Sequence, residues 1–127
     1  MESTVQERNI LLIDDDEDFV STLAERLRLR GFRVETAASA EEAFVLLEDL
    51  SPDVIVFDIL LGMDYLKRLL AEHPEIPVII FTDMGMNLIG KEGLRMGAKT
   101  CLMKPFDIEE LLDAIHESSE RSRVPTE

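Results

Sequence analysis

The chain has 127 residues, 46% of them apolar, which suits one domain with a hydrophobic core. Its 27 acidic and 13 basic residues give a formal net charge of −14, which argues against binding nucleic acid or an anionic membrane through a basic face. The single cysteine excludes an internal disulfide, and the sequence shows neither a signal peptide nor an apolar stretch long enough to span a bilayer. We therefore expect a cytoplasmic protein whose partners are proteins and cations.

Five short apolar runs alternate with amphipathic helical patterns along the chain. After a polar leader at residues 1–8, strands are predicted at residues 9–13, 32–37, 54–57, 78–81 and 99–103. Helices are predicted at residues 17–30, 39–50, 64–72 and 88–96, with a last helix from 107 that frays near 118. Residues 120–127 are expected to form a flexible tail or the start of a linker. Short continuous apolar runs are typical of parallel strands buried on both faces, so the pattern predicts a doubly wound α/β domain at residues 9–119.

The local sequence supports the second and the fourth predicted helices to different degrees. Ser39 and Glu42 form a capping box at the start of the second helix. The fourth helix is the weakest prediction, because Gly90 and Gly93 each cost about 1 kcal/mol relative to alanine inside a helix.

Polar residues follow four of the strands at the point where each apolar run ends. They are Asp14, Asp15 and Asp16, then Asp58, Thr82 and Lys104. Because parallel strands end at the same edge of a sheet, these side chains should gather there, where open α/β sheets bind ligands. Converging carboxylates repel one another unless a cation neutralises them, and hard oxygen ligands favour Mg²⁺ over zinc. The sequence therefore predicts an acidic metal site with an ammonium group beside it.

Several nearby residues have ordinary structural explanations. An aspartate after a strand is often a helix N-cap or a turn former, and this interpretation is favoured for Asp16 and Asp18. Such a cap does not explain several aspartates matched by a Lys-Pro pair at the end of the fifth strand. Cys101 lies in a predicted strand and is expected to be a small buried hydrophobe, while His73 and His116 are expected at the surface.

The motifs and their order resemble the receiver domain of two-component response regulators, over about residues 8–119. The resemblance implies a flavodoxin-like (βα)5 fold, a three-layer sandwich with the parallel sheet order 2-1-3-4-5. It implies that Asp58 accepts a phosphoryl group from a sensor histidine kinase, a phosphotransfer protein or a small phosphodonor. Thr82 and Lys104 would then contact the phosphoryl group, and the bond between Lys104 and Pro105 would be cis.

The resemblance also implies Mg²⁺ as the cofactor. Asp15 and Asp58 would bind the ion directly, Asp14 would act through water, and the backbone carbonyl of Leu60 would complete the protein ligands.

The segment after Asp58 departs from the usual receiver pattern. It has no Pro-Gly turn, Tyr65 stands in place of a usual glycine, and the interval to Thr82 is shorter by about four residues, close to one helical turn. Cys101 also replaces an aromatic switch residue, and Asp83 replaces a small residue. These departures keep a second interpretation open, a degenerate receiver-like binding module that works without phosphorylation.

Both interpretations predict a signalling domain and not an enzyme, apart from self-catalysed phosphorylation and dephosphorylation. A haloacid-dehalogenase-like phosphatase would need a second aspartate two residues after the nucleophile, where Leu60 stands. The resemblance implies that phosphorylation alters the surface of the fourth helix, fifth strand and fifth helix. This surface would contact an output domain or a target protein and is a candidate homodimer surface, and an output domain could follow residue 127.

Overall fold

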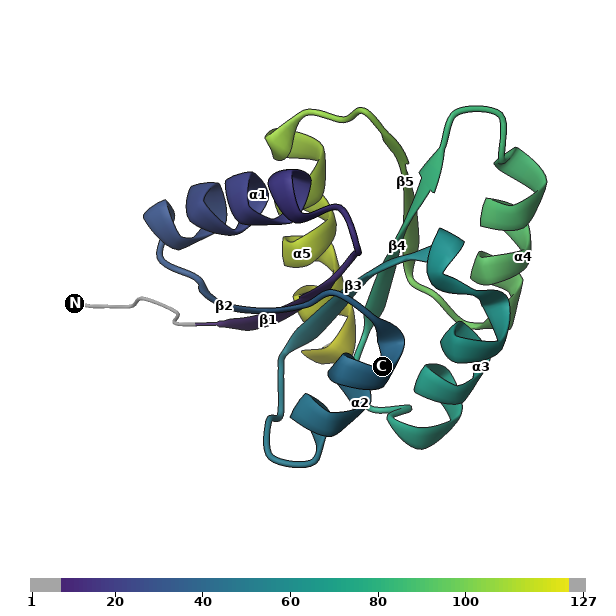
Figure 1. Cartoon of the computed structure of the whole chain (residues 1–127), viewed down its shortest axis with the longest axis horizontal. Helices are drawn as coiled ribbons and strands as arrows, with labels where there is room; N and C mark the ends of the chain where they lie inside the picture. The colour runs from purple at the N-terminus through teal and green to yellow at the C-terminus, as the bar shows by residue number, and fades with distance from the viewer. Residues whose placement is uncertain (1–7, 124–127) are drawn as a thin grey trace.

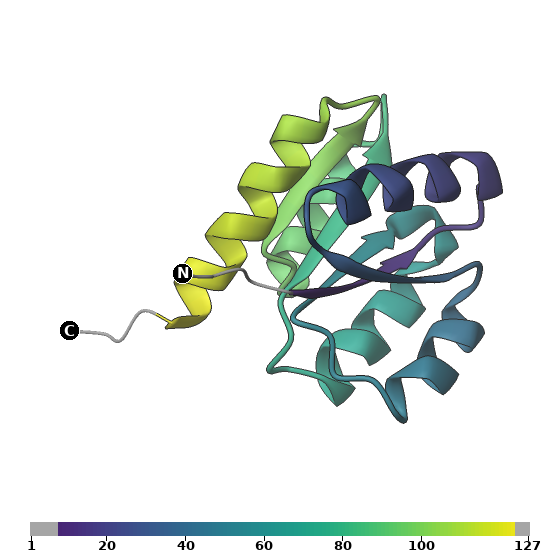
Figure 2. The ribbon, with the colours of Figure 1, turned by 90° about the vertical axis from the view of Figure 1, so that its left-hand side faces the viewer.

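One parallel sheet of five strands lies between two layers of helices (Figures 1 and 2). The computed structural model describes residues 8–123. The strands are β1 (Asn9–Ile13), β2 (Arg33–Ala37), β3 (Val54–Asp58), β4 (Val78–Asp83) and β5 (Thr100–Lys104). The helices are α1 (Glu17–Leu29), α2 (Ala40–Leu47), the short 3-10 helix η2 (Ile59–Leu61), α3 (Met63–Glu72), α4 (Asn87–Met96) and α5 (Ile108–Arg123). The sheet order β2-β1-β3-β4-β5 confirms the predicted doubly wound α/β fold.

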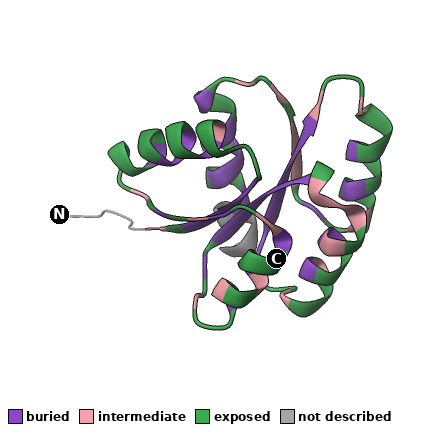
Figure 3. Ribbon diagram, viewed as in Figure 1, coloured by how far each residue is buried: buried purple, intermediate pink, exposed green. Residues whose placement is uncertain are grey.

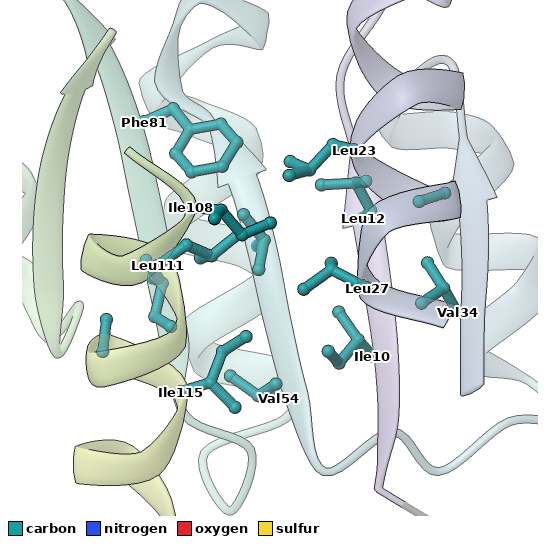
Figure 4. Close-up of a cluster of buried hydrophobic side chains, with 14 of the residues drawn as sticks. Ile10, Leu12, Leu23, Leu27, Val34, Val54, Phe81, Ile108, Leu111 and Ile115 are labelled. Atoms are coloured by element: carbon teal, nitrogen blue, oxygen red, sulfur yellow. The ribbon is translucent and has the colours of Figure 1, made fainter. Parts of the chain in front are cut away.

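The sheet divides the hydrophobic core into two clusters. On one face, α1 and α5 pack on the strands through side chains such as Leu12, Leu27 and Leu111 (Figure 4). On the other face, Leu47 of α2 and Leu66 of α3 belong to the second cluster. The strands β1, β3 and β4 are largely buried, the edge strands β2 and β5 are partly exposed, and the outer sides of the helices are exposed (Figure 3). This packing holds the ends of the central strands in fixed positions.

Several element boundaries differ from the sequence prediction. β4 reaches Asp83 and β5 reaches Lys104, so the strand ends that carry Thr82 and Lys104 are still paired within the sheet. α2 ends at Leu47, before the predicted residue 50, because the next two amides bond carbonyls three residues back and tighten the last turn. α5 continues to Arg123, beyond the predicted fraying point. The 3-10 helix η2 was not predicted.

Residues 1–7 of the predicted leader and 124–127 of the predicted tail lie outside the described residues, whereas residues 120–123 of the predicted tail belong to α5. The predicted domain boundaries at 9 and 119 therefore stay a prediction. Within the described range 8–123, no helix combines the length and the apolar character needed to cross a membrane.

The glycines of α4 are explained by close packing against the sheet. A Cβ atom at Gly90 would lie 2.8 Å from Sγ of Cys101, and one at Gly93 would lie 2.5 Å from Cδ1 of Ile80. Helical propensity alone made this helix the weakest prediction, yet α4 forms over ten residues. The missing side chains let the helix approach β4 and β5 more closely than alanine would allow.

Candidate functional site

Three strands bring two carboxylates and an ammonium group into contact at the carboxyl edge of the sheet. Lys104 Nζ donates to Asp14 Oδ2 at 2.8 Å and to Asp58 Oδ2 at 3.0 Å. Asp14 and Asp58 are 1% and 4% exposed, so these are buried charge-assisted hydrogen bonds. The peptide bond between Lys104 and Pro105 is cis. The strand-end argument from sequence therefore identified residues that do lie together.

Asp15 completes a group of three carboxylates. One oxygen from each of Asp14, Asp15 and Asp58 lies within 4.8 Å of the others, which suits a single bound cation. Asp15 is exposed, so an ion held here would keep access to solvent.

The third aspartate of the triplet is structural. Asp16 is the N-cap of α1, and its side chain accepts a hydrogen bond from the amide of Phe19. Its own amide donates to Asp14 Oδ1 at 3.0 Å, which orients that carboxylate. The N-cap interpretation is therefore confirmed for Asp16 and wrong for Asp18, which lies exposed in the first turn of the same helix.

The loop after Asp58 is a tight turn held by the carboxylate itself. Asp58 Oδ1 accepts a hydrogen bond from the amide of Leu60 at 2.9 Å and caps η2. The amide of Gly62 closes η2 by donating to the Ile59 carbonyl at 3.0 Å, and Gly62 has a φ of +132° that favours glycine. The segment from Ile59 to Gly62 thus connects β3 directly to α3, and its Leu60 amide contacts the Asp58 carboxylate.

Thr82 lies near the end of β4, one position beyond the register partner of Asp58. The residue is 1% exposed, and its Oγ1 lies 3.7 Å from Sγ of half-buried Cys101. Asp83 follows in the last position of the strand, opposite Lys104 in the register. Thr82 and Asp83 therefore lie at the same carboxyl end of the sheet as Asp58 and Lys104.

The charge balance of the site favours an added positive charge. Burial raises the pKa of the Asp14 carboxyl, and its hydrogen bonds from Lys104 and the Asp16 amide offset only part of the effect. Burial by itself would lower the pKa of Lys104, but hydrogen bonds to Asp14 and Asp58 outweigh it and raise the pKa. One ammonium group thus sits among three carboxylates, and a proton or a metal cation would relieve the remaining repulsion.

Aromatic rings lie beside Lys104, and the sequence did not predict this contact. The ring of Phe19 lies 4.3 Å from Lys104 Nζ, and this ring packs edge-on against Phe81 and Phe106. The cation–π contact restricts the ammonium group to the side of the carboxylates. The only sequence signal was an aromatic residue in the first turn of the helix after the acidic triplet.

The remaining titratable candidates lie away from this group. His73 caps the end of α3, where its Nδ1 is 4.0 Å from Glu75, and His116 is exposed on α5. His116 is exposed as expected, whereas His73 is half-buried, and neither histidine belongs to the acidic cluster.

Comparison with known proteins identifies the family. The response regulator receiver domain family matches residues 10–116, which is most of the chain. This chain belongs to the response regulator receiver domains of two-component systems. The acidic cluster and Lys104 lie at the carboxyl edge of the sheet of this receiver.

Curated relatives and solved structures support the assignment of this receiver. The transcriptional regulatory protein CpxR of Klebsiella pneumoniae is 40% identical over 117 residues, covering 89% of this chain and 50% of CpxR. The photosynthetic apparatus regulatory protein RegA of Cereibacter sphaeroides is 31% identical, covering 95% of this chain and 68% of RegA. The chain therefore spans about half the length of CpxR.

The solved structures have the same fold. The crystal structure of the NtrX receiver domain from Brucella abortus has a TM-score of 0.84 at 28% identity, covering 87% of this chain and 98% of that one. A receiver domain protein from Clostridium thermocellum has a TM-score of 0.85 at 30% identity, covering 91% of this chain and 97% of that one.

Proposed function

We propose that this receiver accepts a phosphoryl group on Asp58. The observation that carries the proposal is the placement of Lys104, whose ammonium donates to both Asp14 and Asp58 at the edge of the sheet. In the proposed reaction an Asp58 carboxylate oxygen attacks phosphorus and forms an acyl phosphate. The bond from phosphorus to a donor histidine nitrogen breaks at the same time, and the imidazole leaves with the electron pair.

Mg²⁺ is the cofactor that we propose for this step. Asp15 and Asp58 would bind it directly, Asp14 through water, and Leu60 through its backbone carbonyl. The donor set supports this choice, because it offers oxygen ligands and neither histidine nor cysteine lies in the acidic group. When bound, Mg²⁺ neutralises charge between the acceptor carboxylate and the phosphoryl oxygens.

The protein side chains would then hold the phosphoryl group. Lys104, whose ammonium now donates to two carboxylates, would keep its contact with Asp58 and also donate to a phosphoryl oxygen. The Thr82 hydroxyl would donate to another phosphoryl oxygen and leave its present position 3.7 Å from Cys101 Sγ. This movement is the proposed switch, since it changes the contacts between β4, β5 and α4.

The decisive test is intact mass spectrometry after incubation with acetyl phosphate and Mg²⁺. We expect the wild type to gain one phosphoryl group, and we expect Asp58→Asn to gain none. Mg²⁺ should raise the melting temperature of the wild type and raise that of Asp15→Asn much less, because the variant loses a direct ligand. Equal stabilisation of both proteins would refute the metal assignment.

The alternative is a receiver-like module that works without phosphorylation. Two observations favour it: Asp83 adds an acidic residue at the end of β4, opposite Lys104 in the register, and Cys101 provides no aromatic ring to rotate. A wild type that gains no phosphoryl group while its acidic site still binds Mg²⁺ would support this alternative.

The partners follow from the same proposal. A sensor histidine kinase or a phosphotransfer protein would supply the phosphoryl group. The matched relatives are named as regulatory proteins and extend beyond the matched segment, which supports an output domain or a target protein as the recipient of the signal. We place this contact, and a candidate homodimer contact, on the surface of α4, β5 and α5.

A further inference from the structure

The one tyrosine of the chain links the loop after Asp58 to a neighbouring helix. Tyr65 lies in the first turn of α3, and its hydroxyl donates to the Glu41 carboxylate in the first turn of α2. Its ring lies close to Gly62, since a Cβ atom at Gly62 would be 3.3 Å from Tyr65 Cδ2. Tyr65 therefore contacts the end of the loop with its ring and α2 with its hydroxyl.

The α2 side of this contact is itself held in place. Ser39 Oγ accepts from the Glu42 amide at 3.1 Å, and Glu42 Oε1 accepts from the Ala38 amide at 2.8 Å, a complete capping box. One residue earlier, the Ala37 carbonyl accepts from the Asp14 amide at 3.1 Å. The start of α2 is thereby fixed relative to the acidic site.

A second set of contacts supports the tyrosine from the side. The ring of Phe44 lies 6.4 Å from that of Tyr65, and the Arg68 guanidinium lies 3.8 Å from the Phe44 ring centroid. Arg68 is also paired with Glu72 at 2.8 Å. These contacts join the exposed sides of α2 and α3 around the tyrosine, so the Tyr65 ring has little freedom to leave Gly62.

The second half of the loop has backbone hydrogen bonds at Gly62, from the Gly62 amide to the Ile59 carbonyl at 3.0 Å and from the Leu66 amide to the Gly62 carbonyl at 3.2 Å, but few side-chain contacts hold the residues around Leu60. Ile59 is buried and anchors the start of η2, but Leu60 is 53% exposed and Gly62 has no side chain. No proline restricts the backbone between Asp58 and α3. Without an external contact, the backbone around Leu60 would sample more conformations, and a metal ligand there would lose preorganisation.

We propose that Tyr65 and Glu41 form a brace that positions the Ile59–Gly62 backbone and so sets the Mg²⁺ affinity of the acidic site. Tyr65 and Glu41 are positioning residues in this proposal and do not touch the ion. The proposal rests on the proposed function, because it assigns the Leu60 carbonyl to the metal.

The brace itself can be measured through the phenol of Tyr65, which is the only tyrosine. The hydrogen bond to Glu41 raises the pKa of Tyr65, while the nearby Arg68 guanidinium partly offsets the shift. Titration of phenolate absorbance should show this raised pKa in the wild type and a lower one in Glu41→Ala. Identical titrations would show that the contact is absent in solution and would overturn the proposal.

The effect on the metal site is tested by calorimetric Mg²⁺ titration. We expect Tyr65→Phe and Glu41→Ala each to weaken Mg²⁺ binding about threefold to tenfold, the range for one net hydrogen bond. Glu41→Gln keeps an acceptor for the hydroxyl and should bind nearly as the wild type does. Glu48→Ala, which removes an exposed carboxylate directly after α2 and away from the Tyr65 hydrogen bond, is the matched control and should also be unchanged.

The outcomes separate this inference from the proposed function. A wild type that binds no Mg²⁺ would overturn the proposed function and the brace with it. Equal Mg²⁺ affinity in the wild type, Tyr65→Phe and Glu41→Ala would overturn the brace alone, even if the two variants melted lower. A loss of affinity in Glu48→Ala equal to that in Glu41→Ala would assign the effect to net charge and would also overturn it.

Discussion

Lys104 is the counter-ion of a site in which negative charge exceeds positive charge. Its ammonium contacts both buried aspartates, whereas each aspartate has other negative groups nearby. The two kinds of substitution should therefore have opposite effects on stability. Removing a carboxylate relieves repulsion, and removing the ammonium leaves the carboxylates buried without a partner.

For the carboxylates, we predict that Asp15→Asn and Asp58→Asn each melt at a higher temperature than the wild type in EDTA. The amide keeps the shape of the side chain and removes one negative charge from the cluster. Differential scanning calorimetry at neutral pH measures the change. Melting temperatures clearly below that of the wild type in both variants would mean that these side chains act as structural hydrogen-bond acceptors.

For the ammonium, we predict that Lys104→Met lowers the free energy of unfolding by about 2 to 4 kcal/mol at neutral pH. The value lies toward the lower end for a buried pair, because the Lys104 side chain is 19% exposed. The measurement is urea denaturation in EDTA, with Lys99→Met, an exposed residue just before β5, as the control.

The loss in Lys104→Met should also depend on pH. Asp14 has a raised pKa in the folded protein, so its ionisation opposes folding. This cost is absent below the unfolded pKa of an aspartate, develops between that pKa and the folded pKa, and is larger without Lys104, whose hydrogen bond lowers the Asp14 pKa. The difference between Lys104→Met and the wild type should therefore shrink toward acidic pH, and a difference independent of pH would contradict the ion-pair explanation.

At the scale of elements, α4 shows how tertiary packing can reverse a propensity argument. Gly93 is buried, and a Cβ atom there would lie 2.5 Å from Ile80 Cδ1 and 3.1 Å from Ile59 Cδ1. We predict that Gly93→Ala destabilises the protein by about 1 to 2 kcal/mol, because overpacking exceeds the gain of up to about 1 kcal/mol in helix propensity. Lys91→Ala, at an exposed position of the same helix, should be nearly neutral. A stabilised Gly93→Ala would show that the helix can move outward at no cost.

The sequence predicted the strands and the convergence of their terminal side chains because both depend on local patterns. Continuous apolar runs mark buried parallel strands, and parallel strands place Asp14, Asp58 and Lys104 at one edge. The short helix η2 and the contact between Phe19 and Lys104 could not be predicted in the same way. Both depend on which side chains meet after the layers pack. Phe19 and Lys104 are 85 positions apart in the sequence, and such a distant contact leaves no periodic pattern.

At the scale of the whole molecule, the acidic site and the surface of α4 and β5 share a buried contact. Thr82 Oγ1 lies 3.7 Å from Cys101 Sγ, and the same sulfur lies against Gly90 of α4. Beyond this contact, Leu88 and Met103 are 80% and 39% exposed, so little burial holds the outer side of this surface. A displacement of Thr82 would therefore change the packing of a helix that is only weakly held.

We predict that hydrogen exchange across α4 (Asn87–Met96) changes when Mg²⁺ and beryllofluoride, a stand-in for the phosphoryl group, are added. The physical reason is that a Thr82 hydroxyl drawn toward the bound group leaves Cys101, and the Cys101 sulfur then no longer fixes Gly90. Thr82→Val keeps the shape of the side chain without the hydroxyl, so it should retain the exchange change near Asp58 and lose the change in α4. A change around Asp58 in the wild type without any change in α4 would break the proposed coupling between the acidic site and this surface.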